Sequence, residues 1–124
     1  MIEKQWNYRN HNCTVNFTQM GHRCGYVETT LDINSEGITC HGGITFKGTL
    51  SVINNAFVIG FDCGHCGDKA DLQALAGYYP DSTFTPHIFD NTTIRTLEFC
   101  IKECESIVDQ LITNEAVNCT EEHF

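Results

Sequence analysis

Between positions 22 and 66 the chain carries seven cysteine and histidine residues, the two types that hold most structural zinc ions. They fall at three separate places, each in or at the end of a stretch that favours a β-strand. Zinc takes four such ligands in a tetrahedron, and antiparallel strands bring distant residues side by side. The sequence therefore predicts a zinc ion held by a sheet. The candidate ligands are His22, Cys24, Cys40, His41, Cys63, His65 and Cys66.

The spacing of these residues does not decide which four bind the metal. The single Cys-x-x-Cys pair, formed by Cys63 and Cys66, does not match a zinc finger with two such pairs. A zinc ion closed from three strands would fix a small sheet, because its binding free energy adds to the free energy of folding. The alternative is that the thiols are buried as small apolar groups and that the histidines are hydrogen-bonded.

The tetrapeptide Cys63-Gly64-His65-Cys66 has a second interpretation. It is the active-site sequence of disulfide isomerases, in which a thiolate at a helix N-terminus is activated. Here several strand-like segments come before it, and Asp62 precedes Cys63, where a carboxylate raises the pKa of a thiol instead of lowering it. A dithiol oxidoreductase that uses Cys63 and Cys66 is therefore kept as the second alternative function.

Other catalytic patterns are absent from the sequence. It contains no His-Glu-x-x-His motif, no zinc-deaminase signature, no serine nucleophile elbow and no phosphate-binding glycine loop. We therefore expect a binding protein and not an enzyme. The first alternative is a small zinc-dependent enzyme or a ligand-sequestering protein, with a pocket lined by Tyr78, Tyr79 and Arg95.

The chain is acidic, with 16 acidic and 7 basic side chains and a formal net charge of −9. General binding of nucleic acid requires clustered lysine and arginine, so this composition argues against it. An acidic surface suits a partner with a basic face, although solubility alone also favours an acidic composition. The candidate contacts lie on a predicted C-terminal helix and are Glu98, Glu103, Glu105 and Asp109.

Eight cysteines in 124 residues is a high number, and in a secreted chain it would indicate four disulfides. The chain opens MIEKQWNYRNHNC, without the apolar stretch of a signal peptide, and no segment is apolar over the length that crosses a membrane. We therefore expect a cytoplasmic protein. In a reducing cytoplasm, clustered cysteine and histidine indicate metal or redox chemistry before they indicate disulfides.

The first half of the chain is typical of a β-sheet. Cys13, Val15 and Phe17 alternate with polar residues, which predicts a half-buried strand. The run 22–29 predicts a second short strand after a glycine.

Two longer runs follow in the same half. Residues 38–46 predict a strand interrupted by the pair Gly42-Gly43, which we interpret as a bulge or a close backbone approach. Within residues 50–61, the pair Asn54-Asn55 is either a hairpin turn or a polar stretch inside one strand. We favour a buried apolar strand over residues 56–61, which leads directly to the Cys63 region.

The second half of the chain is predicted to be helical. A short helix is expected over Asp71–Ala76, ending at Gly77, followed by a loop over residues 78–90 that contains both prolines. The strongest pattern is a helix over Asn91–Ile112, capped by Asn91, Thr92 or Thr93. Its apolar residues recur at steps of three and four. They are Ile94, Leu97, Ile101, Cys104, Val108 and Leu111.

A long helix with one apolar stripe must pack against the predicted sheet. The expected fold class is therefore α+β: an antiparallel β-sheet in the N-terminal half, packed against one long C-terminal helix and a short helix, in a single domain over residues 1–124. Cys100 and Cys104 lie on the long helix and are expected to be packed core residues. Cys13 and Cys119 are left without a role.

Four blocks of the sequence resemble a family of small proteins encoded by bacteriophages and prophages. The blocks are GHRCGYV (21–27), HGGITF (41–46), IGFDCGHCGD (59–68) and RTLEFCIKECESIVDQL (95–111). The resemblance spans roughly residues 21–111. Members typically carry a Cys-x-His-x-Gly-Asp block, which falls here on Cys63, His65, Gly67 and Asp68.

The family pattern leaves the position of Cys66 variable. The resemblance therefore favours Cys24, His41, Cys63 and His65 as the ligands of a structural zinc ion. It implies an accessory anti-defence protein, similar to the anti-CRISPR proteins that inhibit the type II effector nuclease. The implied partner is a host defence protein in the cytoplasm of an infected bacterium. Direct contact with nucleic acid or with a membrane is not expected.

Overall fold

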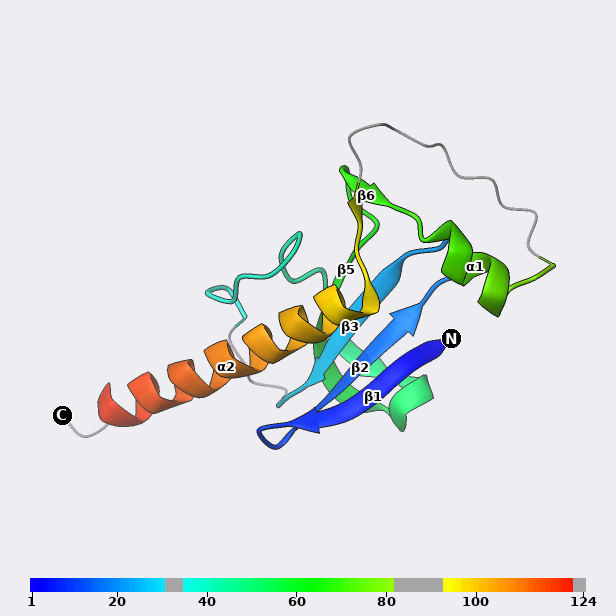
Figure 1. Cartoon of the computed structure of the whole chain (residues 1–124). Coiled ribbons are helices and arrows are strands. Elements are labelled where there is room, and N and C mark those ends of the chain that lie inside the picture. Colours follow the sequence, from blue (N-terminus) through cyan, green and yellow to red (C-terminus); the bar gives the residue numbers. More distant parts are fainter. Residues whose placement is uncertain (31–34, 82–92, 122–124) are drawn as a thin grey trace.

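The computed structural model describes residues 1–30, 35–81 and 93–121. Its main element is an antiparallel sheet in the order β1-β2-β3-β5-β4, with the long helix α2 across one face (Figure 1). The helices are α1 (Leu72–Tyr78) and α2 (Leu97–Glu121). The predicted α+β class is thereby confirmed. The five strands are β1 (Ile2–Tyr8), β2 (His11–Phe17), β3 (Arg23–Glu28), β4 (Phe46–Leu50) and β5 (Ala56–Asp62).

Tight turns fix the register of two hairpins in the sheet. Arg9 and Asn10 join β1 to β2 with φ values of 48° and 68°. Asn54 and Asn55 both have φ of 59° and follow the short 3-10 turn η1 (Ser51–Ile53) between β4 and β5. Successive left-handed residues match the twist of antiparallel strands. The asparagine pair is therefore a turn, and the strand predicted over residues 56–61 is β5.

Residues 38–45 form turns and irregular backbone, so the strand predicted over residues 38–46 is wrong except for its last residue. Gly42 and Gly43 have φ of 70° and 79°, in the left-handed region that an extended strand does not use. The amide of Gly43 donates to the carbonyl of Cys40 at 3.0 Å. The glycine pair therefore makes a tight turn in a loop and is not a bulge in a strand. The other alternative that we gave, a close approach to the backbone, is found at Gly42, where an added Cβ atom would stand 2.6 Å from the ring of His65.

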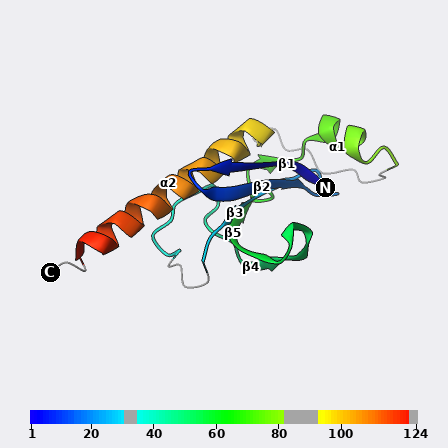
Figure 2. The same ribbon diagram turned by 90° about the horizontal axis from the view of Figure 1, so that it is seen from below.

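The core lies between the sheet and α2, as Figure 2 shows from below, with β4 at the edge of the sheet opposite β1. Alternate residues of β2 face this core, as the period of two in its sequence predicts. Cys100 and Cys104 are fully buried, which confirms their packing role. The other buried core residues of the central strands and α2 include Cys13, Val15, Val27, Ile59, Phe61, Ile107, Val108 and Leu111.

The helix α2 begins later than predicted. Thr93 and Ile94 form the short strand β7, so the apolar stripe starts at Leu97 instead of Ile94. The hydroxyl of Thr96 accepts a hydrogen bond from the amide of Phe99 at 3.1 Å, which is the geometry of an N-cap. Asn91 and Thr92, which we also considered as caps, lie outside the described residues, as does most of the loop predicted over residues 78–90.

The short helix α1 is close to its prediction. The carboxylate of Asp71 accepts a hydrogen bond from the amide of Ala74 at 3.1 Å and caps the N-terminus. The helix continues one residue past Gly77, where it was predicted to end. No helix in the described ranges has the length and apolar character needed to span a membrane.

The guanidinium of Arg23 joins the sheet to α1. This arginine is 5% exposed and donates to both oxygens of Glu3, at 2.6 and 3.0 Å, and to Asp71 at 2.9 Å. It also donates to the carbonyl of Arg95 at 3.1 Å, just before α2. Since a buried cation requires such partners, this contact ties β1, β3, α1 and the start of α2 together.

A small pair of parallel strands lies beside the contacts of Arg23. The strand β6 (Asp68–Lys69) pairs with β7 (Thr93–Ile94), with Asp68 opposite Thr93. The chain that follows β5 is thereby held next to the chain that leads into α2. This pairing brings together two blocks of sequence that are well separated along the chain.

The start of α2 can be tested with two threonine variants. We expect Thr96→Ala to lower the free energy of unfolding by about 1 kcal/mol, because it removes the side chain that accepts from an otherwise unpaired helical amide. The matched variant Thr93→Ala, at an exposed position, should change it by less than about 0.5 kcal/mol. Urea unfolding followed by circular dichroism measures both. A larger effect for Thr93→Ala would place the cap where the sequence predicted it.

Candidate metal centre

Three side chains that the sequence places far apart meet at one end of the sheet. His41 lies in the loop before β4, His65 lies in the connection from β5 to β6, and Asp68 is the first residue of β6. One potential ligand atom from each side chain lies within 4.8 Å of the other two. Among the described residues this is the one group of three or more such side chains.

Asp68 is the centre of the cluster. Its side chain is 1% exposed. Nε2 of His41 lies 2.9 Å from each of its carboxylate oxygens, and Nε of Arg95 donates to Oδ1 at 2.9 Å. The amide of His65 donates to Oδ2 at 3.1 Å. Burial raises the pKa of Asp68, but these hydrogen bonds outweigh it and lower the pKa below its ordinary value of 3.8, so the group is an anion at neutral pH.

The ring of His65 lies against a turn of backbone. Its Nδ1 is 3.1 Å from the carbonyl oxygen of Asp62. A Cβ atom at Gly42 would stand only 2.6 Å from Cε1 of this ring, so only glycine leaves room for it. The glycine pair thus has a local reason: it turns the chain after His41 and lets the second imidazole approach.

His41 is held against α2. Its amide donates to Oε1 of Glu103 at 2.8 Å, and its ring meets the ring of Phe99 edge to face, with centroids 5.3 Å apart. The guanidinium of Arg95 lies 5.0 Å from the centre of the same phenylalanine ring. The helix therefore positions both His41 and the arginine that contacts Asp68.

Of the four ligands that the family resemblance favours, the structure brings His41 and His65 together and leaves the two cysteines outside the group. Cys24 lies on β3 next to Gly25. Gly25 faces α2, since a Cβ atom added to it would stand 2.9 Å from Sγ of Cys104 on that helix. Because neighbouring residues of a strand point to opposite faces, Cys24 points away from that helix. Cys63 is 2% exposed, with its Sγ 3.7 Å from Sγ of Cys100.

The other three candidates also lie outside the group. Cys40 packs against the core, and Cys66 is exposed. The ring of His22 lies near Gly64: a Cβ atom added to that glycine would be 3.8 Å from the ring. Nδ1 of His22 is buried with no hydrogen-bond partner in the described part of the chain.

The thiols next to the core are poor nucleophiles. The contact with Cys100 and burial both raise the pKa of Cys63, and burial raises the pKa of Cys40 to about 11. Both are therefore protonated at neutral pH. A catalytic dithiol requires a lowered pKa and an accessible thiolate, so the environment of Cys63 does not favour its use with Cys66 as a redox pair.

The set of two imidazoles and one carboxylate suits a divalent transition metal. One class of catalytic zinc site uses two histidines and one carboxylate with an open position, and the same set binds iron(II) in many oxygenases. The prediction omitted Asp68 because zinc in small proteins is more often held by cysteine and histidine. The signal was present in the sequence, since Asp68 ends the Cys-x-His-x-Gly-Asp block.

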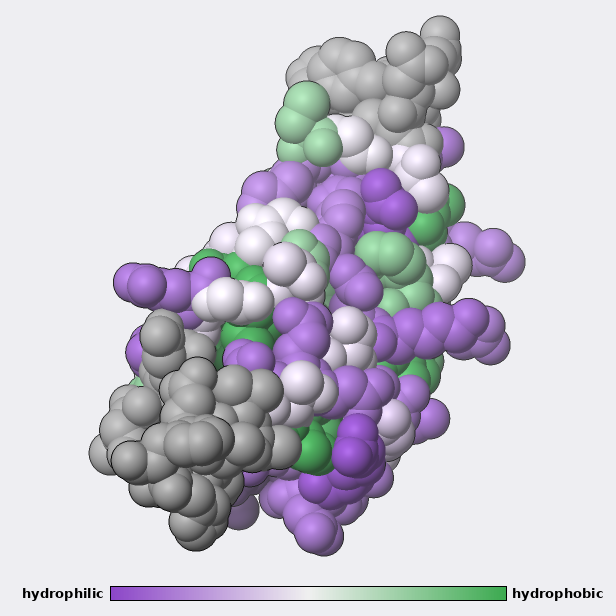
Figure 3. Space-filling view, turned by 90° about the vertical axis from the view of Figure 1, so that its left-hand side faces the viewer, coloured by the Kyte–Doolittle hydropathy of each residue, from purple (hydrophilic) through white to green (hydrophobic). Residues whose placement is uncertain are grey.

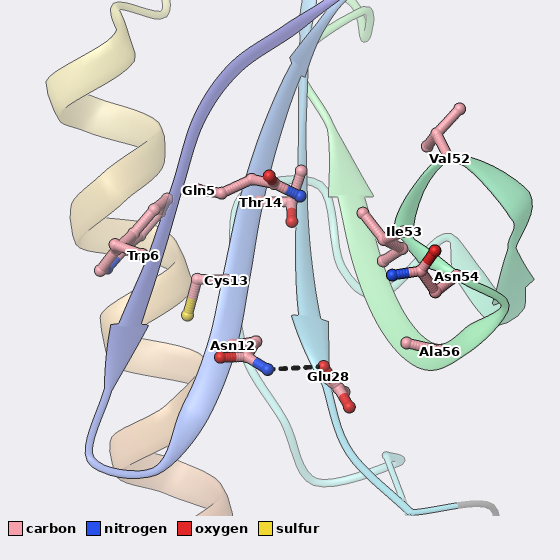
Figure 4. A pocket seen from close by; sticks show the side chains of 10 residues that line it. All are labelled: Gln5, Trp6, Asn12, Cys13, Thr14, Glu28, Val52, Ile53, Asn54 and Ala56. Carbon is pink, nitrogen blue, oxygen red and sulfur yellow. Dashed lines mark hydrogen bonds between the residues drawn. The ribbon is translucent and has the colours of Figure 1, made fainter.

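The three residues predicted to line one ligand pocket lie at two different places in the structure. Tyr78 and Tyr79 border a hollow of about 360 Å³ together with Pro80, whereas Arg95 contacts Asp68. A larger hollow of about 700 Å³ lies against β1, β2, β3 and the η1 turn (Figure 4). Two of its lining residues are hydrogen-bonded, as Figure 4 shows: the side-chain amide of Asn12 donates to the carboxylate of Glu28 at 3.0 Å.

Comparison of the chain with models of known protein families, with curated proteins and with solved structures finds no significant match.

Replacing Asp68 by asparagine tests the charge of this cluster. Because the folded pKa of Asp68 is lowered, its ionised form stabilises the fold above pH 3.8, and this contribution is lost as the pH falls through the folded pKa. We therefore expect Asp68→Asn to lower the free energy of unfolding by about 1–3 kcal/mol at pH 7.

The difference between wild type and Asp68→Asn should shrink below pH 3.8. Denaturant unfolding at a series of pH values measures it. Asp81→Asn, at an exposed position, is the matched control and should stay within about 0.5 kcal/mol of wild type. A difference for Asp68→Asn that is the same at every pH would contradict the assignment of a buried anion.

Proposed function

We propose that the protein acts by binding a basic partner, as a phage-encoded anti-defence protein that inhibits a host CRISPR effector nuclease through protein–protein contact. The observation that carries this proposal is the use of the arginines. All three in the chain contact carboxylates of the same chain: Arg9 with Asp109 at 2.7 Å, Arg23 with Glu3 and Asp71, and Arg95 with Asp68.

The net charge of −9 already counts every lysine and arginine, and the three arginines are engaged by carboxylates of the same chain, so the molecule presents an acidic surface. Such a surface attracts a positively charged partner and speeds its association. The face seen in Figure 3 is mainly hydrophilic, and its hydrophobic residues lie in small separate patches. A partner on that face would therefore be recognised mainly by polar and charged contacts. CRISPR effector nucleases carry basic channels for guide RNA and DNA, which fit this description.

The four acidic residues of α2 that we consider as partner contacts differ in whether they are already used within the fold. Glu103 accepts from the amide of His41, and Asp109 accepts from Tyr8 at 3.0 Å as well as from Arg9, so both carboxylates have a role in the fold. Glu98 is exposed and Glu105 is half-buried, and the two lie seven residues apart on one side of the helix. We infer that these two glutamates are the better candidates for contact with a partner.

A second candidate function is the sequestering of a small ligand. It is favoured by the hollow beside Tyr78 and Tyr79, whose hydroxyls are fixed. The hydroxyl of Tyr78 donates to Glu3 at 2.7 Å, and that of Tyr79 accepts from the amino terminus at 3.3 Å. Two pre-oriented aromatic rings suit a flat, partly apolar ligand.

The partner proposal is tested with a purified type II effector nuclease loaded with guide RNA. We expect the wild-type protein to form a complex with it and to inhibit DNA cleavage. Glu98→Lys combined with Glu105→Lys should weaken binding about tenfold, because two attractive charges become repulsive. Lys102→Glu, on the same side of α2, is the matched control and should keep or strengthen binding. Absence of both complex and inhibition at excess protein would rule the proposal out.

The sequestering candidate makes a different prediction. Native mass spectrometry of the protein taken from phage-infected cells should then show an additional bound mass. Tyr78→Phe keeps the ring and should keep that mass, whereas Tyr78→Ala should lose it. Protein that carries no additional mass in such cells would contradict this candidate and leave the partner proposal unaffected.

A further inference from the structure

We propose that His41, His65 and Asp68 bind one divalent transition-metal ion, zinc in the first instance, and leave a coordination position open to water or to an oxyanion from another molecule. This inference goes beyond the proposed function and does not depend on it. Its ligand set also differs from the one that the sequence predicted, since it contains a carboxylate and no thiolate.

The spacing of the ligand atoms fits a metal with a small adjustment. Two ligands of a tetrahedral zinc ion, each about 2.1 Å from the metal, stand roughly 3.4 Å apart. In the structure, Nε2 of His41 lies 2.9 Å from the Asp68 oxygens. An opening of a few tenths of an ångström between the two side chains would therefore admit the ion. The ligand atom of His65 lies within 4.8 Å of the other two, so its ring would move inward by up to about 1.4 Å to reach the tetrahedral spacing.

The hydrogen bonds around the ligands have the pattern of a metal site. In such sites a histidine usually donates its non-ligating N–H to a carbonyl or a carboxylate, which fixes the ring and its tautomer. Nδ1 of His65 faces the carbonyl of Asp62 at 3.1 Å, so this tautomer leaves the lone pair on Nε2. Asp68 accepts from Arg95 and from the amide of His65, and a carboxylate has further acceptor positions for a metal.

The exposure of the three side chains indicates where a further ligand would bind. Asp68 is buried, His41 is 19% exposed and His65 is 37% exposed. The open position is therefore expected on the solvent side, beside the two imidazoles. Arg95 adds a positive charge next to the metal, so the favoured external ligand is an anion such as a carboxylate or a phosphate oxygen.

Thiolate ligation is disfavoured by the surroundings of the cysteines. Sγ of Cys63 packs against Sγ of Cys100 at 3.7 Å, and Cys24 points to the face of the sheet opposite α2. Neither thiol belongs to the group of potential ligand atoms formed by His41, His65 and Asp68. A different account of the cluster has no metal at all, with His41 and Asp68 forming only a hydrogen-bonded ion pair.

Cobalt(II) distinguishes these accounts, because it replaces zinc and reports its ligands by absorption. We would purify the full chain with a chelator, remove the chelator, and titrate with Co²⁺ and then with Zn²⁺. The proposal expects one Co²⁺ per chain, visible bands of a nitrogen and oxygen site, no thiolate charge-transfer band in the near ultraviolet, and displacement by Zn²⁺. A thiolate band would overturn it in favour of the cysteine set, and the absence of stoichiometric binding would overturn it in favour of the ion pair.

Variants test the individual ligands. His65→Ala should weaken Co²⁺ binding by more than about tenfold while circular dichroism shows a folded chain, since this side chain is the most exposed of the three. His11→Ala, which removes a histidine bonded to the carbonyl of Glu28, is the matched control and should bind Co²⁺ as wild type does. Equal binding by His65→Ala and wild type would overturn the proposed ligand set.

The open position is tested separately with azide as the probe anion. We expect azide to change the visible spectrum of the cobalt protein, because it replaces the bound water. A spectrum that does not respond to azide at concentrations far above that of the protein would contradict the open position. The result is independent of the nuclease experiment, so failure of one proposal is distinguishable from failure of the other.

Discussion

The end of the sheet that carries the candidate metal centre depends on one buried carboxylate. A charge as deeply buried as that of Asp68 is costly unless it is matched by donors. Its donors come from His41, Arg95 and the amide of His65, which belong to three separate segments of the chain. Satisfying this one group therefore fixes the loop before β4, the connection after β5 and the start of α2 relative to one another.

A second buried charge, of opposite sign, lies at the same end of the sheet. The guanidinium of Arg23 is enclosed by Glu3 and Asp71, and it donates to the carbonyl of Arg95, whose side chain contacts Asp68. Arg95 is thus shared by both clusters. The remainder of the interior, between the sheet and α2, is apolar, so the molecule combines an ordinary packed core with one polar end where chemistry is concentrated.

The sequence predicted the parts of the fold that depend on periodicity. The alternation at Cys13, Val15 and Phe17 and the stripe of α2 both follow from burying one face. It failed at residues 38–46, where the glycine pair adopts left-handed angles, and it missed β1, whose two faces are not sharply different. It found two members of the candidate site. It omitted Asp68, although this residue ends the Cys-x-His-x-Gly-Asp block, because cysteine and histidine were considered first as zinc ligands; the pairing of Asp68 with His41 and Arg95 is visible only in the tertiary fold.

The most direct test of the account is anomalous X-ray diffraction at the zinc absorption edge, from crystals of the protein purified without chelator and supplied with zinc. We expect one strong anomalous peak between the side chains of His41, His65 and Asp68, with density for a further non-protein ligand. A peak bonded to Cys24 or Cys63, or a cluster without any peak, would contradict it.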